Sequence, residues 1–314
     1  MDEKQRTTSN ASIEHVVAPE DVGVKLRTII RKRMKISRRL TSKLKLAENG
    51  ITVNGRRLYM DAVLRAGDKV VVTLPVETSE QIEPQPMSLD IRYEDDSLLI
   101  VNKPSGLIVH PTLGHYRDTL ANGVMHYWLE RGESYRFRPV HRIDEHTSGI
   151  VVIAKNAYVH SHLSEQLQNR TMERVYTAVV HGKVKERAGT ICGPIDRDPA
   201  DPHKRIVTDK GYPAITHYTV RNSWSDATML DIQLETGRTH QIRVHMQHFG
   251  HPLIGDPLYG LSKYEYAWQD AIARQALHAR KISFIHPMSG ERIVTEAPLP
   301  EDIQRLLERI IASQ

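Results

Sequence analysis

The sequence predicts an α+β protein whose main domain has a mixed, largely antiparallel central sheet, preceded by a small N-terminal α/β module. Short strand-like runs alternate irregularly with helical patterns, without the regular strand–helix–strand repeat of a parallel sheet. The 314 residues also exceed the usual length of a single domain. We therefore expect a flexible arm at residues 1–20, the N-terminal module at 21–75, an acidic linker at 76–88 and the main domain at 89–314.

The N-terminal module is predicted to contain two helices and a hairpin. Apolar residues follow one helical face at Leu26, Ile29, Ile30 and Met34. Ser37 is suited to cap a second helix that ends at Gly50. The predicted buried positions of that helix are Leu40, Leu44 and Ala47. Strand-like residues then flank Asn54-Gly55, a dipeptide typical of a tight hairpin turn.

Positive charge is concentrated in the N-terminal module. Residues 23–74 contain 14 Lys and Arg against 3 acids, a net charge of +11, whereas the whole chain carries +5. Such a concentration is typical of a surface that follows nucleic-acid phosphates, although a basic run can also be a solvated helix face. The candidate phosphate-contacting residues are Arg31, Arg38, Arg39 and Lys43.

The segment at 76–88 is rich in Glu and Pro, which predicts a linker. In the main domain, apolar runs predict strands at 98–101, 150–154, 175–180 and 230–234. Amphipathic patterns predict helices at 119–129, 157–167, 239–249 and 303–312.

Composition excludes several classes of protein. No apolar run approaches the roughly 18 residues of a membrane span, and residues 1–10 contain no signal-peptide core, so we expect a cytoplasmic protein. A single cysteine, Cys192, excludes an internal disulfide framework and a Cys-rich zinc site. His240, His245 and His248 share a predicted helix without a carboxylate at ligand spacing, so no metal site is expected.

The segment His-Arg-Ile-Asp-Glu-His-Thr-Ser-Gly at 141–149 is the strongest candidate for chemistry. It places Asp144, with Arg142 two positions earlier, in a loop that runs directly into the apolar strand 150–154. An isolated Asp before a Thr-Ser-Gly turn is more often a turn or cap residue. The functional interpretation of Asp144 therefore depends on the other segments.

Three further segments contribute candidate site residues. They are 102–111, a strand exit into a Pro- and Gly-containing loop, 174–178, an alternating strand, and 235–245, the start of a helix that Thr239 is suited to cap. Their candidate residues are Lys103, Tyr176, Arg238 and Arg243. Taken alone, Tyr176 would be a sheet-face aromatic and Arg243 a surface residue.

In this order, the four segments resemble the RluA-type family of pseudouridine synthases. The run at 141–149 carries the resemblance, and Gly-Asp-Pro-Leu-Tyr-Gly at 255–260 and Leu-His-Ala at 277–279 extend it. Ile143 stands where Leu is usual and Arg174 where Lys is common. The resemblance implies a pseudouridine-synthase fold and an enzyme that isomerises RNA uridines without a cofactor or a metal.

The N-terminal module resembles the S4 RNA-binding module. Ser37-Arg38 and Val53-Asn54-Gly55 carry this likeness, while Glu48 introduces an acid where a plainer turn is more common. The likeness implies that the cations of the module bind RNA. An S4-like module joined to this catalytic type implies large-subunit ribosomal RNA as the substrate, with transfer RNA as the alternative. The sequence contains no signal for an oligomeric state, and a monomer is the default expectation.

The family resemblance implies that Asp144 is the essential carboxylate. Breaking the glycosidic bond develops positive charge on the sugar, and a carboxylate there can stabilise this charge, attack C1′ or remove the C2′ proton. The sequence leaves these three roles open. By the same resemblance, Arg243 keeps Asp144 ionised through a charge-assisted pair, and Tyr176 stacks on a base that has been flipped out of its helix.

The remaining candidates are expected to contact RNA. Arg142 would occupy the vacated base stack or hold the flanking phosphates, while Lys103 and Arg238 would contact the RNA or support the fold. Two other classes are weighed against the enzyme: a non-catalytic RNA-binding or ribosome-assembly protein on the same scaffold, and a hydrolytic nucleosidase or nuclease. Loss of Asp144, Tyr176 or Arg243 would indicate the first, and a water-activating base or metal set the second.

Overall fold

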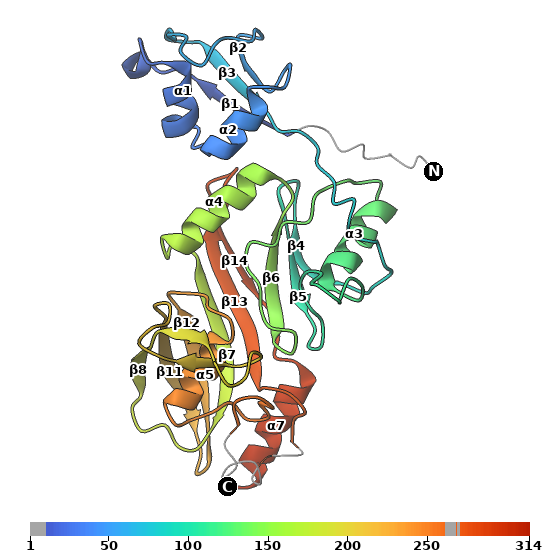
Figure 1. Cartoon of the computed structure of the whole chain (residues 1–314), viewed down its shortest axis with the longest axis vertical. Helices are drawn as coiled ribbons and strands as arrows, with labels where there is room; N and C mark the ends of the chain where they lie inside the picture. Colours follow the sequence, from blue (N-terminus) through green and yellow to red (C-terminus); the bar gives the residue numbers. More distant parts are fainter. Residues whose placement is uncertain (1–10, 261–267, 269–270) are drawn as a thin grey trace.

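The computed structural model describes residues 11–260, 268 and 271–314. Figure 1 shows the N-terminal module at one end, a long twisted sheet through the middle and the C-terminal helix at the other end. Within the described residues, none of the helices is long and apolar enough to cross a membrane.

The N-terminal module pairs its helices with a small antiparallel sheet. In the described part of the chain this sheet has three strands, in the order β1 (Ser12–Val16), β3 (Lys69–Thr73) and β2 (Ile51–Val53). The helical segments are η1 (Pro19–Asp21), α1 (Leu26–Thr28), the π-helical turn η2 (Ile29–Arg33) and α2 (Arg38–Leu44). The expected first helix is therefore one α-turn continued by a π-turn.

The expectation of a flexible arm at 1–20 is wrong for residues 12–20, and residues 1–10 lie outside the described part. β1 pairs along its length with β3, from Ser12 opposite Thr73 to Val16 opposite Lys69. Val17 is buried, and Ile13 packs against the core. The segment is ordered because it supplies the second partner of β3, whose backbone groups would otherwise be left unpaired on one side.

Most local predictions for the module are confirmed. The Ser37 side chain accepts a hydrogen bond from the Leu40 N–H at 3.3 Å, which caps α2. Asn54 and Gly55 both have positive φ, as the predicted turn requires. Ala47, expected to be buried, is exposed because α2 ends at Leu44.

The acidic segment 76–88 crosses from the N-terminal module to the main domain without helix or strand. Glu77 forms ion pairs with both Lys43 of the module and Arg138 of the main domain. Ile82 is buried in the core of the main domain. The predicted linker therefore contacts both the N-terminal module and the main domain.

The main sheet is mixed and largely antiparallel, as predicted. Its nine strands in the described residues run in the order β4 (Asp90–Glu94), β5 (Leu98–Lys103), β6 (Ser148–Ala154), β13 (Leu277–Ile285), β7 (Glu173–His181), β12 (Ala227–Leu234), β11 (Ile215–Ser223) and β8 (Ala188–Cys192), with β14 (Arg292–Glu296) also paired to β13. The parallel contact is between β13 and β6. A separate hairpin joins β9 (Ile195–Arg197) to β10 (Arg205–Val207).

The helices of the main domain cover this sheet. They include α3 (Leu120–Glu130), α4 (Ala157–Gln168), α5 (Gln241–His248) and α7 (Glu301–Ala312). Every residue of β6 is buried, since Ile150 and Val152 join the core beside α4 while Val151 and Ile153 join the core beside α3. The continuous apolar run in the sequence thus reflects a strand covered on both faces.

The start of α5 differs from the prediction. Its N-cap is His240 in the left-handed conformation, φ 57°, with no capping side chain, and Thr239 is exposed. Gln241 fixes the helix start instead, because its amide donates to the Ile215 carbonyl and to Thr216, both at 3.0 Å. Gly250 follows the helix with positive φ, as expected for its end.

Candidate active site

A cavity of about 750 Å³ lies where the four sequence segments meet. It is lined by residues of 108–112, 140–147, 174–176 and 234–243. Segments that are up to about 130 residues apart in sequence therefore line the same cavity. Asp144, Arg142, Tyr176, Arg238 and Arg243 all lie on this lining.

Sheet register brings Tyr176 next to the Asp144 loop. Gly149, which ends the 141–149 segment, pairs with Ala279 of β13, and Ala279 pairs on its other side with Tyr176 of β7. Gly149 has φ 115°, and a Cβ there would lie 2.3 Å from the Ala279 carbonyl oxygen. The glycine of the Thr-Ser-Gly turn thus permits the parallel contact that joins the two halves of the sheet.

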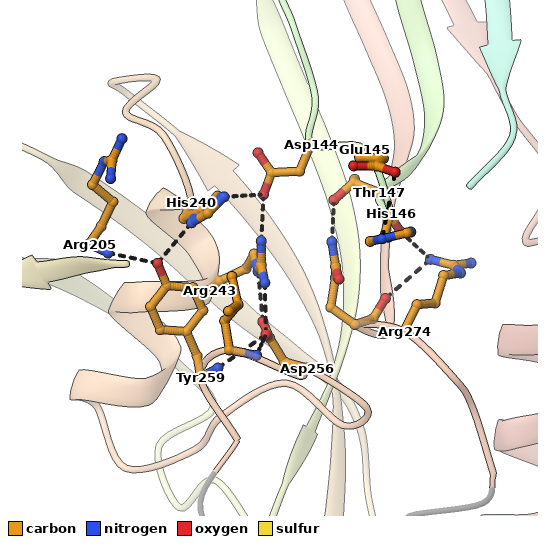
Figure 2. Close-up of polar contacts among 12 residues, drawn as sticks. Asp144, Glu145, His146, Thr147, Arg205, His240, Arg243, Asp256, Tyr259 and Arg274 are labelled. Carbon is orange, nitrogen blue, oxygen red and sulfur yellow. Dashed lines mark hydrogen bonds and ion pairs between the residues drawn. The ribbon is translucent and has the colours of Figure 1, made fainter. Parts of the chain in front are cut away.

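Asp144 and Arg243 are in contact on the lining of the cavity (Figure 2). Arg243 Nη1 lies 3.3 Å from Asp144 Oδ2. The rest of the guanidinium is held by Asp256, which accepts from Nε at 2.7 Å and from Nη2 at 2.8 Å. The Asp256 side chain is fully buried and that of Asp144 is 26% exposed, so one guanidinium joins a buried carboxylate to one that is open to the cavity.

The surroundings of Arg243 keep it charged. Burial alone would lower the pKa of Arg243, but the hydrogen bonds and charge of Asp256, with a smaller contribution from Asp144, raise the pKa above its ordinary value. The guanidinium carbon also lies 5.0 Å from the centre of the Tyr259 ring, a cation–π contact. This cation is therefore fixed in both charge and orientation.

Tyr176 lies in the wall of the cavity with 5% of its surface exposed. Burial raises the pKa of Tyr176, and Asp144 adds to this effect while the neighbouring Arg174 opposes it. The phenol is therefore protonated at neutral pH. Its uncharged aromatic ring lies on the same cavity lining as the Asp144 carboxylate.

Two buried basic side chains hold the backbone of the Asp144 loop. Lys103 Nζ donates to the Glu145 carbonyl at 2.9 Å, and Arg274 Nη1 donates to the His146 carbonyl at 3.1 Å. Arg274 is held in turn by a bidentate pair with Asp302 of α7. Of the two roles expected for Lys103, contact with RNA is wrong because Lys103 is fully buried, and support of the fold agrees with its hydrogen bond to the loop.

The other candidate RNA contacts are accessible. Arg142 and Arg238 are exposed on the cavity lining, and Arg238 stacks on Tyr212 at 5.5 Å from the ring centre. In the N-terminal module, Arg31, Arg38, Arg39 and Lys43 are exposed. Lys43 is paired with Glu77 of the linker.

Sequence reasoning assigned no role to Asp256, Tyr259 or Arg274, all of which support the site. The run 255–260 could have indicated a role for Asp256 and Tyr259, since it belongs to the family pattern. Two of the histidines of 240–251 form hydrogen bonds to other segments: His245 contacts the Thr216 hydroxyl and the Gly193 carbonyl, and His251 contacts the His181 carbonyl.

The fold, the cavity and the Asp144–Arg243 pair are those of an enzyme that acts on RNA nucleosides, and comparison with known proteins names the class. A family model described as RNA pseudouridylate synthase matches residues 97–248. The chain is 46% identical over 263 residues to the uncharacterized RNA pseudouridine synthase YlyB of Bacillus subtilis (strain 168), covering 83% of this chain and 85% of that protein. This protein is an RNA pseudouridine synthase and belongs to the RluA-type family.

Further relatives agree with this assignment. The chain is 44% identical over 255 residues to ribosomal large subunit pseudouridine synthase D of Xanthomonas campestris pv. campestris, covering 79% of this chain and 77% of that protein. Among solved structures, human RNA Pseudouridylate Synthase Domain Containing 4 has the same fold, with a TM-score of 0.58 and 24% identity over 70% of this chain and 92% of that chain. Neither a non-catalytic binder nor a hydrolase describes this chain.

Proposed function

We propose that this enzyme isomerises uridines of large-subunit ribosomal RNA, with Asp144 as the essential carboxylate, Arg243 as its cationic partner and Tyr176 as the stacking face. The observation that carries the proposal is the 3.3 Å contact between Asp144 Oδ2 and Arg243 Nη1 on the lining of a cavity that also contains Tyr176. The fixed guanidinium offers Asp144 a charge-assisted contact, and the partly exposed carboxylate has an open side from which a ribose can approach.

The choice of RNA is supported by the relatives and by charge. Several relatives that the chain matches over most of their length are named ribosomal large subunit pseudouridine synthase D, at 40% identity in Neisseria meningitidis (Z2491) and 44% in Xanthomonas campestris. The N-terminal module has a net charge of +11 over residues 23–74. Transfer RNA is the alternative substrate, and mapping the modified positions distinguishes the two.

The proposed reaction needs no external energy. Cleavage of the C1′–N1 bond leaves positive charge on the ribose and negative charge on uracil, and the base then rotates and bonds to C1′ through C5. The C5 proton is then lost and N1 gains a proton, so the product is an isomer of uridine. Asp144 stabilises the ribose cation, attacks C1′ or removes the C2′ proton. The uridine must leave its helix to reach the cavity, at a cost of roughly a few kcal/mol. Arg142 lies on the cavity lining, and in this proposal it fills the vacated stack or holds the flanking phosphates.

The proposed organisation has an S4-like RNA-binding module at the N-terminus, extended by β1 beyond the expected 21–75, and a catalytic domain from residue 89. Arg31, Arg38, Arg39 and Lys43 supply phosphate contacts in the module, and Arg238 supplies one at the cavity. We further propose that the enzyme works in the cytoplasm as a monomer, without a cofactor or a metal.

Tritium release from RNA labelled at uridine C5 tests the catalytic proposal. Asp144→Asn is expected to abolish release while RNA affinity stays within about twofold, since Asn keeps the shape of the side chain but cannot carry the charge. Turnover by this variant at the wild-type rate would contradict the assignment. Pseudouridine mapping of total RNA from cells with and without the gene then identifies the substrate, and sites confined to transfer RNA would reject the ribosomal target.

A further inference from the structure

His240 is a second side chain directed at Asp144, and the family pattern alone did not give it a role. Its Nε2 lies 3.9 Å from Asp144 Oδ2, the same oxygen that Arg243 contacts at 3.3 Å. Figure 2 shows His240 and Arg243 approaching this oxygen from two sides. The other oxygen, Oδ1, has neither of these contacts.

The backbone of His240 is held in an uncommon conformation. His240 is a non-glycine residue at φ 57° and ψ 18°, in the left-handed region, where most residues are strained. The following residue, Gln241, anchors the chain there through its hydrogen bonds to Ile215, Thr216 and the Arg238 N–H. This conformation places the imidazole over the cavity lining beside Asp144.

The Tyr259 hydroxyl contacts the imidazole nitrogen of His240 that faces away from Asp144. The Tyr259 hydroxyl accepts the backbone N–H of Arg205 at 2.8 Å and lies 2.8 Å from His240 Nδ1. The hydroxyl proton is not used by Arg205 and is free to be donated to Nδ1. In the tautomer that accepts it, the imidazole proton is on Nε2, the atom that faces the carboxylate.

We propose that His240 is a positioning residue: its Nε2–H donates to Asp144 Oδ2 and, together with Arg243, directs Oδ1 toward the ribose. The 3.9 Å separation is longer than a hydrogen bond, as donor contacts in unliganded active sites often are, and it closes when the nucleoside enters. Burial lowers the pKa of His240, with Arg243 and Arg205 acting in the same direction and Asp144 and Asp256 opposing them, so the ring is a neutral donor at neutral pH.

This inference rests on the proposed role of Asp144, and three variants of the full-length enzyme test it. His240→Asn tolerates the left-handed backbone and retains a polar atom near the Nδ1 position, but it lacks a donor at Nε2. His240→Gln carries an amide N–H near the Nε2 position. His248→Asn is the matched control, since His248 is exposed on the same helix.

Single-turnover tritium release is measured with excess enzyme and C5-tritiated total RNA from cells that lack the gene. We expect His240→Asn to slow release about tenfold or more, the effect of losing one hydrogen bond to a charged group, while RNA affinity and Tm match those of the control. His240→Gln is expected to be faster than His240→Asn. A His240→Asn rate equal to the control, or no advantage of Gln over Asn, would overturn the proposal.

Tyr259→Phe tests the tautomer, because it keeps the ring against Arg243 and removes the hydroxyl. It is expected to slow release, with no additional loss in the double variant with His240→Asn. Multiplying effects would show that the two residues act separately and would overturn this part of the proposal. Asp144→Asn is run in parallel: turnover by that variant rejects the proposed catalyst, whereas an inactive Asp144→Asn with a fast His240→Asn rejects the role of His240 alone.

Discussion

Asp256 holds Nε and Nη2 of Arg243 at 2.7 and 2.8 Å, which directs Nη1 to Asp144. The backbone N–H groups of Leu258 and Tyr259 also donate to Asp256, at 3.0 and 3.2 Å, so the buried carboxylate has four donors. This arrangement makes the charge beside Asp144 part of a rigid structure. A flexible cation at the same place would have to be ordered each time RNA binds.

We therefore expect Asp256→Asn to reduce both activity and stability. Loss of the carboxylate removes the bidentate partner of a buried guanidinium, at a cost of about 3 kcal/mol in the free energy of unfolding. Single-turnover tritium release should fall at least tenfold, and Tm should fall with it. Arg243→Lys is the companion variant, since an ammonium cannot bridge both carboxylates, and a fully active Arg243→Lys would contradict this account.

Gly149→Ala is expected to destabilise the enzyme strongly. The new Cβ would lie 2.3 Å from the Ala279 carbonyl oxygen at φ 115°, so β6 and β13 would have to separate. Gly290→Ala is the control, because Gly290 also has positive φ but open space around its Cβ. Urea denaturation should give a loss of about 1 kcal/mol for the control and at least about 3 kcal/mol for Gly149→Ala. Equal losses would exclude the steric explanation.

Lys103→Met is expected to reveal a pH-dependent contribution to stability. Burial, assisted by Arg274, lowers the pKa of Lys103 from 10.5 to about 7. Between these two values the unfolded chain binds more protons than the folded chain, so the stability of the wild type relative to the variant rises as pH increases from about 7 to 10.5. Below pH 7 the difference is constant. Urea denaturation of both proteins at several pH values from 6 to 10 measures this difference in the free energy of unfolding. A difference that does not change with pH would refute the lowered pKa of Lys103.

The N-terminal cations are expected to set the salt dependence of RNA binding. A triple variant, Arg31→Gln, Arg38→Gln and Arg39→Gln, removes three exposed charges. If each contacts a phosphate, the slope of log affinity against log salt becomes shallower by about 2, at roughly 0.7 per contact. Arg305→Gln on α7 is the control. A slope unchanged from that of the control would mean that these cations lie outside the RNA interface.

The local sequence predicted much of the fold. The apolar runs that became β5, β6, β7 and β12 were located because strands and helices leave a short-range pattern of apolar residues. The cap at Ser37 and the turn at Asn54-Gly55 were predicted for the same reason. By contrast, β1 was missed, because Ile13 and Val17 gain their burial from β3 and the core, which lie far away in the sequence.

The sequence by itself determined the family, the α+β class and the candidates Asp144, Tyr176 and Arg243, because these follow from residues in a fixed order along the chain. The tertiary structure decided which groups act on them. Contacts between distant segments supply the partners of Asp256, His240 and the fully buried Lys103. Burial also changes which charge state of a group is favoured, and the neighbouring residues in the sequence do not reveal this. For this reason the sequence left Lys103 either to contact RNA or to support the fold, and only the structure showed that it supports the loop that carries Asp144.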